Sequence, residues 1–288
     1  MGSKCCTERK DETNPAKQGR QSIAAFGKGG GKQISIGYHS RGDDAEKFDK
    51  AFESNDLKGF VALLGSGQII ESFDERMHPW AEDPKTIGAL AGTQLAILAS
   101  EADKDNPMLK EEIFEAGAVQ PLVEYLRSDD QPDRVQTAVV ALSFLTAECS
   151  KVANAAYKGG AMPLLLKHLD SPVGGMRAAA ATTLRNICME SEEYRGKFMD
   201  LGGMRGLVQQ LDPKPDPVLN HTDVQLEAVL NFQDMIENEE GHVITKYALL
   251  AIKNGAEEKL KKLMESPDEE VKNAAEDSLS ALTAVKKT

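Results

Sequence analysis

The chain has 288 residues, of which 41% are hydrophobic and only 5% aromatic, and its formal net charge is −12. This length suits one or two compact domains or one elongated array of repeats. No apolar run approaches the roughly 18 to 20 residues that a membrane-spanning helix needs. Charged residues between positions 4 and 12 also interrupt the region that would be apolar in a secretory signal, so we expect the protein to stay in the cytosol.

The net charge hides two regions of opposite sign. Residues 1–42 contain eight basic and three acidic side chains, a net charge of +5. The remaining 246 residues contain 26 basic and 43 acidic side chains, a net charge of −17. Such an acidic body repels phosphate groups, so we expect no nucleic-acid partner.

The first six residues match the pattern of a doubly acylated N-terminus. Removal of Met1 would expose the amine of Gly2, which can accept a myristoyl group, and Cys5 and Cys6 are placed to accept palmitate. The common pattern has Ser or Thr where this chain has Cys6. One myristoyl chain binds membranes only marginally, so a second lipid makes the anchoring stable. The alternative is an ordinary polar start that happens to contain these residues.

The segment that follows is predicted to be a disordered, basic tail and linker extending to residue 42. It is polar and rich in Gly, which is typical of flexible linkers. Lys4, Arg9 and Lys10 lie beside the predicted lipids, where each adds about 1 kcal/mol of attraction to an anionic surface. We therefore expect the tail to lie on a membrane while the acidic body stands away from it.

Residues 43–288 are predicted to be helical and to repeat. A Gly followed nine residues later by Leu or Met recurs at Gly117, Gly160, Gly202 and Gly255. After each comes a longer segment whose apolar positions fall on one helical face, at the spacing i, i+3, i+4, i+7. All-helical units that recur every 42 to 53 residues are typical of an α-solenoid. The approximate repeats are 43–102, 103–149, 150–190, 191–239 and 240–288.

Each repeat is expected to contain three helices, with the Gly adopting a positive φ where the first helix ends and the second turns away. The segments EAGAVQPLVEYL, KGGAMPLLLKHL and AATTLRNIC are similar to the armadillo-repeat consensus. This resemblance covers roughly residues 45–285 and implies an all-α, right-handed superhelical solenoid of about five repeats. The extra residues 212–222 are either a tolerated insertion or a flap that contacts a partner.

The third helices of an armadillo stack form a concave wall. In nuclear-import adaptors of this family, a Trp and an Asn four residues later recur on that wall and hold a basic peptide. The matching positions here are Thr93 and Ile97, Val140 and Phe144, Thr182 and Asn186, Leu230 and Asp234, and Asp277 and Ala281. Because only Asn186 is retained, the nuclear-import function is disfavoured.

The wall is nevertheless expected to be a protein-binding groove with an apolar middle and an acidic C-terminal end. Phe144 is either an exposed anchor for the partner or a core residue. Asn186 is either a clamp for a peptide backbone or a surface residue, and Arg185 pairs with the partner or with its own chain. The candidate groove residues are Val140, Phe144, Arg185, Asn186, Leu230, Asp234 and Asp277. They favour a partner with an apolar anchor and a basic flank.

The residues that would support catalysis are missing from the sequence pattern. The five His are scattered without metal-ligand spacing, and there is no dinucleotide fingerprint or Gly-x-Ser-x-Gly motif. Cys149 and Cys188 fall within helical patterns and are expected to be reduced packing residues. We therefore expect no enzyme activity, no cofactor and no metal.

An acylated basic tail joined only to armadillo repeats resembles the armadillo-repeats-only proteins of apicomplexan parasites. The resemblance implies acylation at Gly2, Cys5 and Cys6 and attachment to the cytosolic face of the rhoptry membrane. It also implies three protein partners, namely a myosin motor, an adaptor and an adenylate cyclase, and a role in positioning and docking rhoptries at the cell apex. The alternatives are an acylated scaffold of another organelle, such as the fungal vacuolar one, and a soluble transport adaptor.

Overall fold

The computed structural model describes residues 37–74, 82–106, 108–212, 221–238 and 240–286. The predicted lipidation residues Gly2, Cys5 and Cys6 and the basic residues Lys4, Arg9 and Lys10 lie outside the described residues. Most of the insertion 212–222 lies outside them as well.

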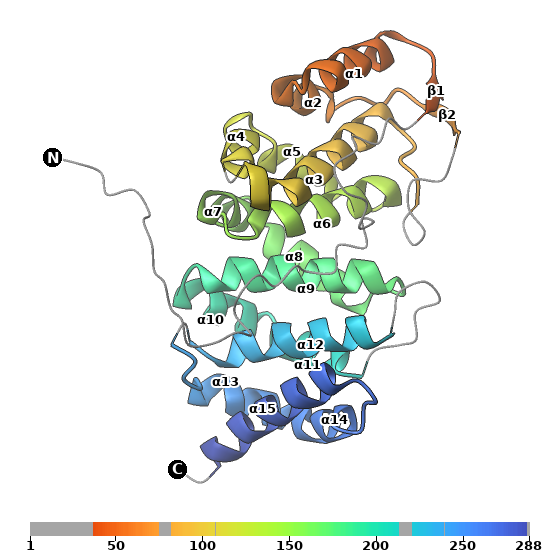
Figure 1. Cartoon of the computed structure of the whole chain (residues 1–288). Coiled ribbons are helices and arrows are strands. Elements are labelled where there is room, and N and C mark those ends of the chain that lie inside the picture. The colour runs from red at the N-terminus through yellow and green to blue at the C-terminus, as the bar shows by residue number, and fades with distance from the viewer. Residues whose placement is uncertain (1–36, 75–81, 107, 213–220, 239, 287–288) are drawn as a thin grey trace, which may run out of the picture.

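The described chain is almost entirely helical, and its helices follow one another in groups of three (Figure 1). The first group is α1 (Asp43–Ser54), α2 (Leu57–Leu63) and α3 (Ile87–Asp105). The second is α4 (Leu109–Glu115), α5 (Val119–Tyr125) and α6 (Pro132–Thr146). The third is α7 (Ser150–Lys158), α8 (Ala161–Leu166), a 3-10 turn (Lys167–Asp170) and α9 (Gly174–Met189). The fourth is α10 (Glu192–Asp200), α11 (Gly203–Gln210) and α12 (His221–Ile236), and the fifth is α13 (Thr245–Lys253), α14 (Ala256–Leu263) and α15 (Glu269–Val285).

The five longest helices, α3, α6, α9, α12 and α15, are the third members of their groups. Each packs beside the next, so they form a continuous row from one end of the stack to the other (Figure 1). One apolar core runs beneath this row from Ala45 in α1 to Leu282 in α15. The all-α solenoid predicted from the repeats is therefore confirmed.

The glycines that mark the repeats occupy the sharp turns between first and second helices. Gly160, Gly202 and Gly255 immediately precede α8, α11 and α14, with φ angles of 84°, 82° and 85°. Gly117 occupies the matching turn before α5, with φ 93°. Side chains with a Cβ rarely adopt this left-handed region, which explains why Gly recurs there.

A short two-stranded antiparallel sheet brackets α1 and α2 in the first repeat and was not predicted. Strand β1 (Tyr38–Ser40) pairs with β2 (Ile70–Phe73). The predicted tail extended to residue 42, but β1 shows that ordered structure begins several residues earlier. The strands are too short for an alternating pattern, and their pairing joins segments about 30 residues apart, so the local sequence does not reveal it.

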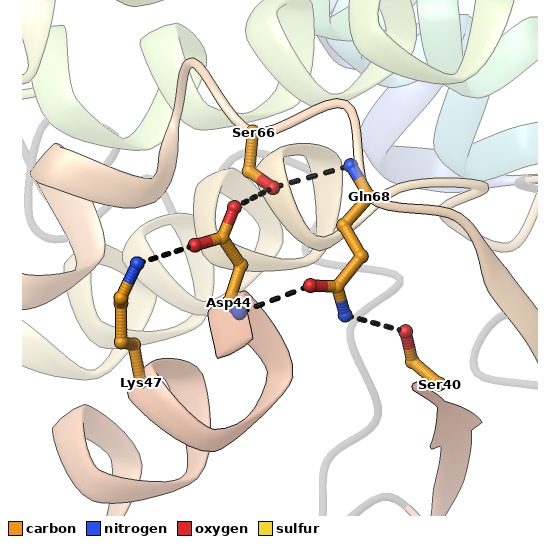
Figure 2. A network of polar contacts seen from close by, with 5 residues as sticks. All are labelled: Ser40, Asp44, Lys47, Ser66 and Gln68. Carbon is orange, nitrogen blue, oxygen red and sulfur yellow. Dashed lines mark hydrogen bonds and ion pairs between the residues drawn. The ribbon is translucent and has the colours of Figure 1, made fainter. Parts of the chain in front are cut away.

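A polar network fastens β1 to the first helix (Figure 2). The Ser66 hydroxyl donates to Asp44 Oδ2 at 2.7 Å, and the Asp44 amide donates to Gln68 Oε1 at 2.9 Å. Gln68 Nε2 donates in turn to Ser40 Oγ at 2.8 Å. Hydrogen bonds from Lys47 and then Ser66 lower the pKa of Asp44 below its usual value. This network fixes the point at which the N-terminal segment joins the body.

Candidate partner-binding face

The outer side of α12 carries a stripe of carboxylates. Asp223, Glu227, Leu230, Asp234 and Glu237 follow one another at intervals of four, three, four and three residues, which places them on one side of a helix. Asp223 is exposed, and the other four are partly exposed. Helix α12 itself contains neither Lys nor Arg, and Asp234 pairs with Arg185 of the preceding repeat.

The opposite side of α12 explains this orientation. Ala228, Phe232 and Met235 are buried, with exposures of 5%, 0% and 0%, and they anchor the helix in the core. Helix α15 packs beside α12 and presents Glu270 and Asp277, both exposed, at positions that match Asp223 and Leu230. We call the set Asp223, Glu227, Asp234, Glu237, Glu270 and Asp277 the acidic face.

The middle of the third-helix row differs from the prediction. Val140 and Phe144 on α6 are only 4% and 8% exposed. Helix α6 packs against α3 on one side and α9 on the other, so both side chains are part of the core. Of the two alternatives for Phe144, the core residue is therefore the correct one, and the inclusion of Val140 among accessible groove residues is wrong.

Asn186 on α9 is also held by the protein itself. It is 6% exposed, and its Nδ2 donates to Thr146 Oγ1 on α6 at 3.0 Å. Its Oδ1 accepts from Arg185 Nη1 at 2.9 Å. Both ends of the amide are therefore engaged within the chain, which corrects the interpretation of Asn186 as a clamp for a peptide backbone.

Arg185 pairs with its own chain, which was one of the two alternatives. Its Nε and Nη2 both approach Asp234 Oδ2 on α12 at 2.8 Å. With the bonds of Asn186, this ion pair links α12, α9 and α6 through Asp234, Arg185, Asn186 and Thr146. We call these four residues the polar crosslink. Of the predicted groove residues, Arg185, Asn186 and Asp234 are engaged by the crosslink, Leu230 is partly exposed and Asp277 is exposed.

A second set of polar contacts joins the first helices of successive repeats, and sequence reasoning missed it. The rings of Tyr157 on α7 and Tyr194 on α10 stack with centroids 3.6 Å apart. Tyr247 on α13 donates to Glu192 on α10 at 2.6 Å. A signal was available, because Tyr194 and Tyr247 each stand eight residues before the Gly of their repeat.

The two cysteines of the body have no exposed thiol. Cys149 is 6% exposed and Cys188 is 1% exposed, and neither forms a disulfide. Burial raises the pKa of Cys188, so its thiolate is strongly disfavoured. Among the described residues, no three His, Cys, Asp or Glu side chains are arranged to hold a metal ion. None of the helices in the described part of the chain is both long and apolar enough to cross a bilayer.

Comparison with known proteins places this geometry in a wider context. No family model matches the chain. It is 24% identical over 221 residues to importin subunit alpha-1b of Oryza sativa subsp. japonica, a match that includes 69% of this chain and 40% of that protein. The chain thus spans about two fifths of the length of the curated relatives it matches.

Solved structures give closer coverage. A designed armadillo repeat protein in complex with the peptide (KR)4 shares the fold, with a TM-score of 0.61, 23% identity and coverage of 82% of this chain and 86% of that one. The armadillo repeats only protein (ARO) from Plasmodium falciparum is 37% identical, with a TM-score of 0.75. That match covers 85% of this chain and 99% of the Plasmodium chain. On this identity and coverage, the chain belongs to the family of armadillo repeats only proteins.

Proposed function

We propose that the protein is a non-enzymatic scaffold that is tethered by N-terminal lipids to the cytosolic face of an organelle and recruits protein partners on its third-helix row. One observation carries this proposal. A predicted double acylation signal is joined, through a basic segment, to a solenoid of the armadillo repeats only family. The third-helix row of this solenoid presents the acidic face. The anchor and the face are two separable parts of the function.

The anchor consists of a myristoyl group on Gly2 and palmitoyl groups on Cys5 and Cys6. The first lipid gives reversible contact with a membrane, and the second slows the release of the protein from that membrane. Lys4, Arg9 and Lys10 add electrostatic attraction to anionic headgroups. By resemblance to the family, the membrane is that of the rhoptry, and the role is positioning and docking of that organelle at the cell apex.

The face suits a partner with a basic flank and an apolar anchor. Leu230 lies between the carboxylates of Glu227 and Asp234 on the same side of α12. An apolar side chain of the partner that packs on Leu230 therefore places the partner's adjacent residues beside negative charge. The designed armadillo protein that binds (KR)4 supports the view that this fold accepts a basic peptide. By resemblance, the partners are a myosin motor, an adaptor and an adenylate cyclase.

The anchor is tested by comparing the membrane fraction of the wild-type protein with that of Gly2→Ala and of Cys5→Ala/Cys6→Ala. We expect Gly2→Ala to be lost from membranes, because myristoylation precedes stable palmitoylation at a docked chain. We expect the double Cys variant to keep only weak contact with many membranes. Ser3→Ala is the matched control and should behave as wild type. Stable attachment of Gly2→Ala to one organelle would refute the anchor.

The face is tested with partly exposed Leu230 and exposed Leu249, which lie on different elements. Leu230 lies on the stripe of α12, whereas Leu249 on α13 is 49% exposed and stands outside the third-helix row. Leu230→Arg should abolish co-precipitation of the myosin or the adaptor, while Leu249→Arg should leave it intact. Equal retention of the partner by both variants would remove the α12 stripe from the binding surface.

A further inference from the structure

The first helices of successive repeats meet through side chains at matching positions. Asn154 and Tyr157 on α7 stand six and three residues before the Gly of their repeat. Tyr194 of the next repeat covers both, because its ring stacks on that of Tyr157 at 3.6 Å and its hydroxyl donates to Asn154 Oδ1 at 2.9 Å. One repeat later, an added Cβ at Gly196 would lie 3.9 Å from the hydroxyl of Tyr247. The residue eight positions before each of these next Gly residues therefore covers the preceding first helix.

Helix α13 presents the same two positions to solvent. Leu249 and Ile252 stand six and three residues before Gly255. Leu249 is 49% exposed, and Ile252 is partly exposed. In the described chain α13 packs against α11, α12, α14 and α15, and its group lies at one end of the stack (Figure 1). Two aliphatic side chains are therefore left at the place that receives a Tyr in the inner repeats.

The charge beside these positions indicates the sign of the side chain that suits them. On α4, Glu111 and Glu115 stand six and two residues before the Gly of their repeat. Lys151 of the next repeat approaches both, at 2.7 and 3.9 Å, from the position directly before the covering residue. On α13 the position two residues before the Gly is exposed Lys253. A helix that packs on α13 in the same register therefore suits an acidic residue at the position of Lys151.

Helix α15 does not offer a matching surface for a further complete repeat. Val139 on α6 and Val229 on α12 occupy matching positions and are both 0% exposed. Gly92 on α3 occupies this position too, and an added Cβ there would meet Thr137 of the next repeat. The matching residue of α15 is Glu276, which is exposed. Because another third helix would bury this carboxylate, the end of the stack favours a single helix on α13.

We propose that Leu249, Ile252 and Lys253 of α13 bind one amphipathic helix of a partner protein, and that this helix carries an acidic residue followed directly by an aromatic one. The aromatic ring packs on Leu249 and Ile252, and the carboxylate pairs with Lys253. We call these three residues the α13 patch. The patch belongs to the first-helix row and is separate from the acidic face, so it serves a different partner. The inference goes beyond the proposed function and depends on neither the anchor nor the acidic face.

Helix α10 supplies the probe, because it contains Glu193 directly before Tyr194 and already covers the equivalent positions of α7. The probe is a fluorescein-labelled peptide of residues 190–201 with a hydrocarbon staple, since a helix this short is marginal in water. Fluorescence anisotropy measures its binding to the full chain. We expect saturable binding, and a peptide with Tyr194→Ala should bind at least about tenfold more weakly, as expected for loss of an aromatic anchor. Absence of saturable binding by the parent peptide would overturn the proposal.

Variants of the full chain locate the binding surface. Leu249→Arg should weaken binding of the peptide at least about tenfold, because it places a charge where the ring packs. Ile69→Arg is the matched control, since Ile69 is an aliphatic residue that is 63% exposed and precedes β2 in the first repeat. It should bind the peptide as the wild type does. Equal affinities of Leu249→Arg and the wild type would remove the α13 patch from the binding surface.

A charge exchange tests the predicted pairing with Lys253. Lys253→Glu should weaken binding of the parent peptide, and a peptide with Glu193→Lys should bind Lys253→Glu more tightly than it binds the wild type. This rescue requires the two side chains to lie close together, and it does not depend on how any variant affects stability. A peptide with Glu193→Lys that binds both chains equally would contradict the proposed register.

Sedimentation velocity separates a partner helix from a second copy of this chain. We expect the wild type and Leu249→Arg both to sediment as monomers at micromolar concentration. A wild-type dimer that Leu249→Arg converts to a monomer would show that a second copy covers the patch, and would overturn the proposal. Membrane attachment and co-precipitation of partners at the acidic face are measured separately, so their failure would count against the proposed function only.

Discussion

Asn186 of α9 donates a hydrogen bond to Thr146 of α6 at 3.0 Å, so the residue that sequence comparison marks as a peptide ligand is a link between repeats. Thr146 Oγ1 donates in turn to the Leu142 carbonyl at 2.7 Å, which orients its lone pairs toward Asn186. The bond crosses the boundary between two repeats and is buried at both ends. It therefore contributes to the interface that each repeat needs in order to bury its apolar surface.

We expect Asn186→Ala to lower the free energy of unfolding by about 1–2 kcal/mol, because the substitution removes the donor to buried Thr146 Oγ1 and an acceptor of Arg185 Nη1. Thr146→Val should have a comparable effect, since it leaves Asn186 Nδ2 unpaired. Urea unfolding of the two single variants and of the double variant measures the coupling. Strictly additive losses would show that the two side chains do not depend on each other.

The ion pair between Arg185 and Asp234 should show a coupling energy of about 1–3 kcal/mol in a double-mutant cycle with Arg185→Met and Asp234→Asn. The side chains are 31% and 14% exposed, so solvent screens this pair less than it screens a fully exposed one. Raising the salt concentration should reduce the coupling only slightly. The exposed pair of Lys85 and Glu82 is the control. Its coupling energy should be small, and added salt should abolish it.

Gly202→Ala should destabilise the protein by about 1–2 kcal/mol, because its φ of 82° lies in the left-handed region that a Cβ disfavours. An added Cβ would meet no atom within 4 Å, so the backbone conformation alone produces this effect. The matched control is Gly196→Ala within α10, where the nearest atom to an added Cβ lies 3.9 Å away. That change should stabilise the helix by about 0.5–1 kcal/mol. Thermal unfolding in which both variants shift in the same direction would contradict this account.

His168 should make the protein less stable as the pH falls below about 6.5. Burial and then the charge of Lys167 lower its pKa in the folded state, so the unfolded chain binds the proton more readily. The effect is absent well above the unfolded pKa and grows as the pH falls through it toward the lower folded pKa. Melting temperatures at pH 7.5 and 5.5 should differ less for His168→Gln than for the wild type. His242→Gln, exposed on a loop, should keep the wild-type difference.

Sequence reasoning located the features that depend on local pattern. The helices repeat because their apolar positions follow the helical period, and Gly160 and Gly202 mark turns because their φ is positive. It did not locate features that depend on how repeats stack. The exposure of Phe144 depends on helices on both sides of α6, and the partners of Asn186 and Arg185 are 40 and 49 residues away. The pairing of Tyr38 with Phe73 is likewise invisible in either short segment.

The network around Ser66 also determines where a pull on the N-terminal segment enters the body. Ser40 and Asp44 are fastened to the same short stretch through Gln68 and Ser66, so tension applied ahead of Gly37 is shared between β1 and α1 (Figure 2). Helices α12 and α15 lie several repeats away along the row (Figure 1). A chain anchored through its first residues is therefore held at one end of the solenoid, and the acidic face lies at the other end. A force from a partner bound to that face acts on the anchor across the whole length of the solenoid.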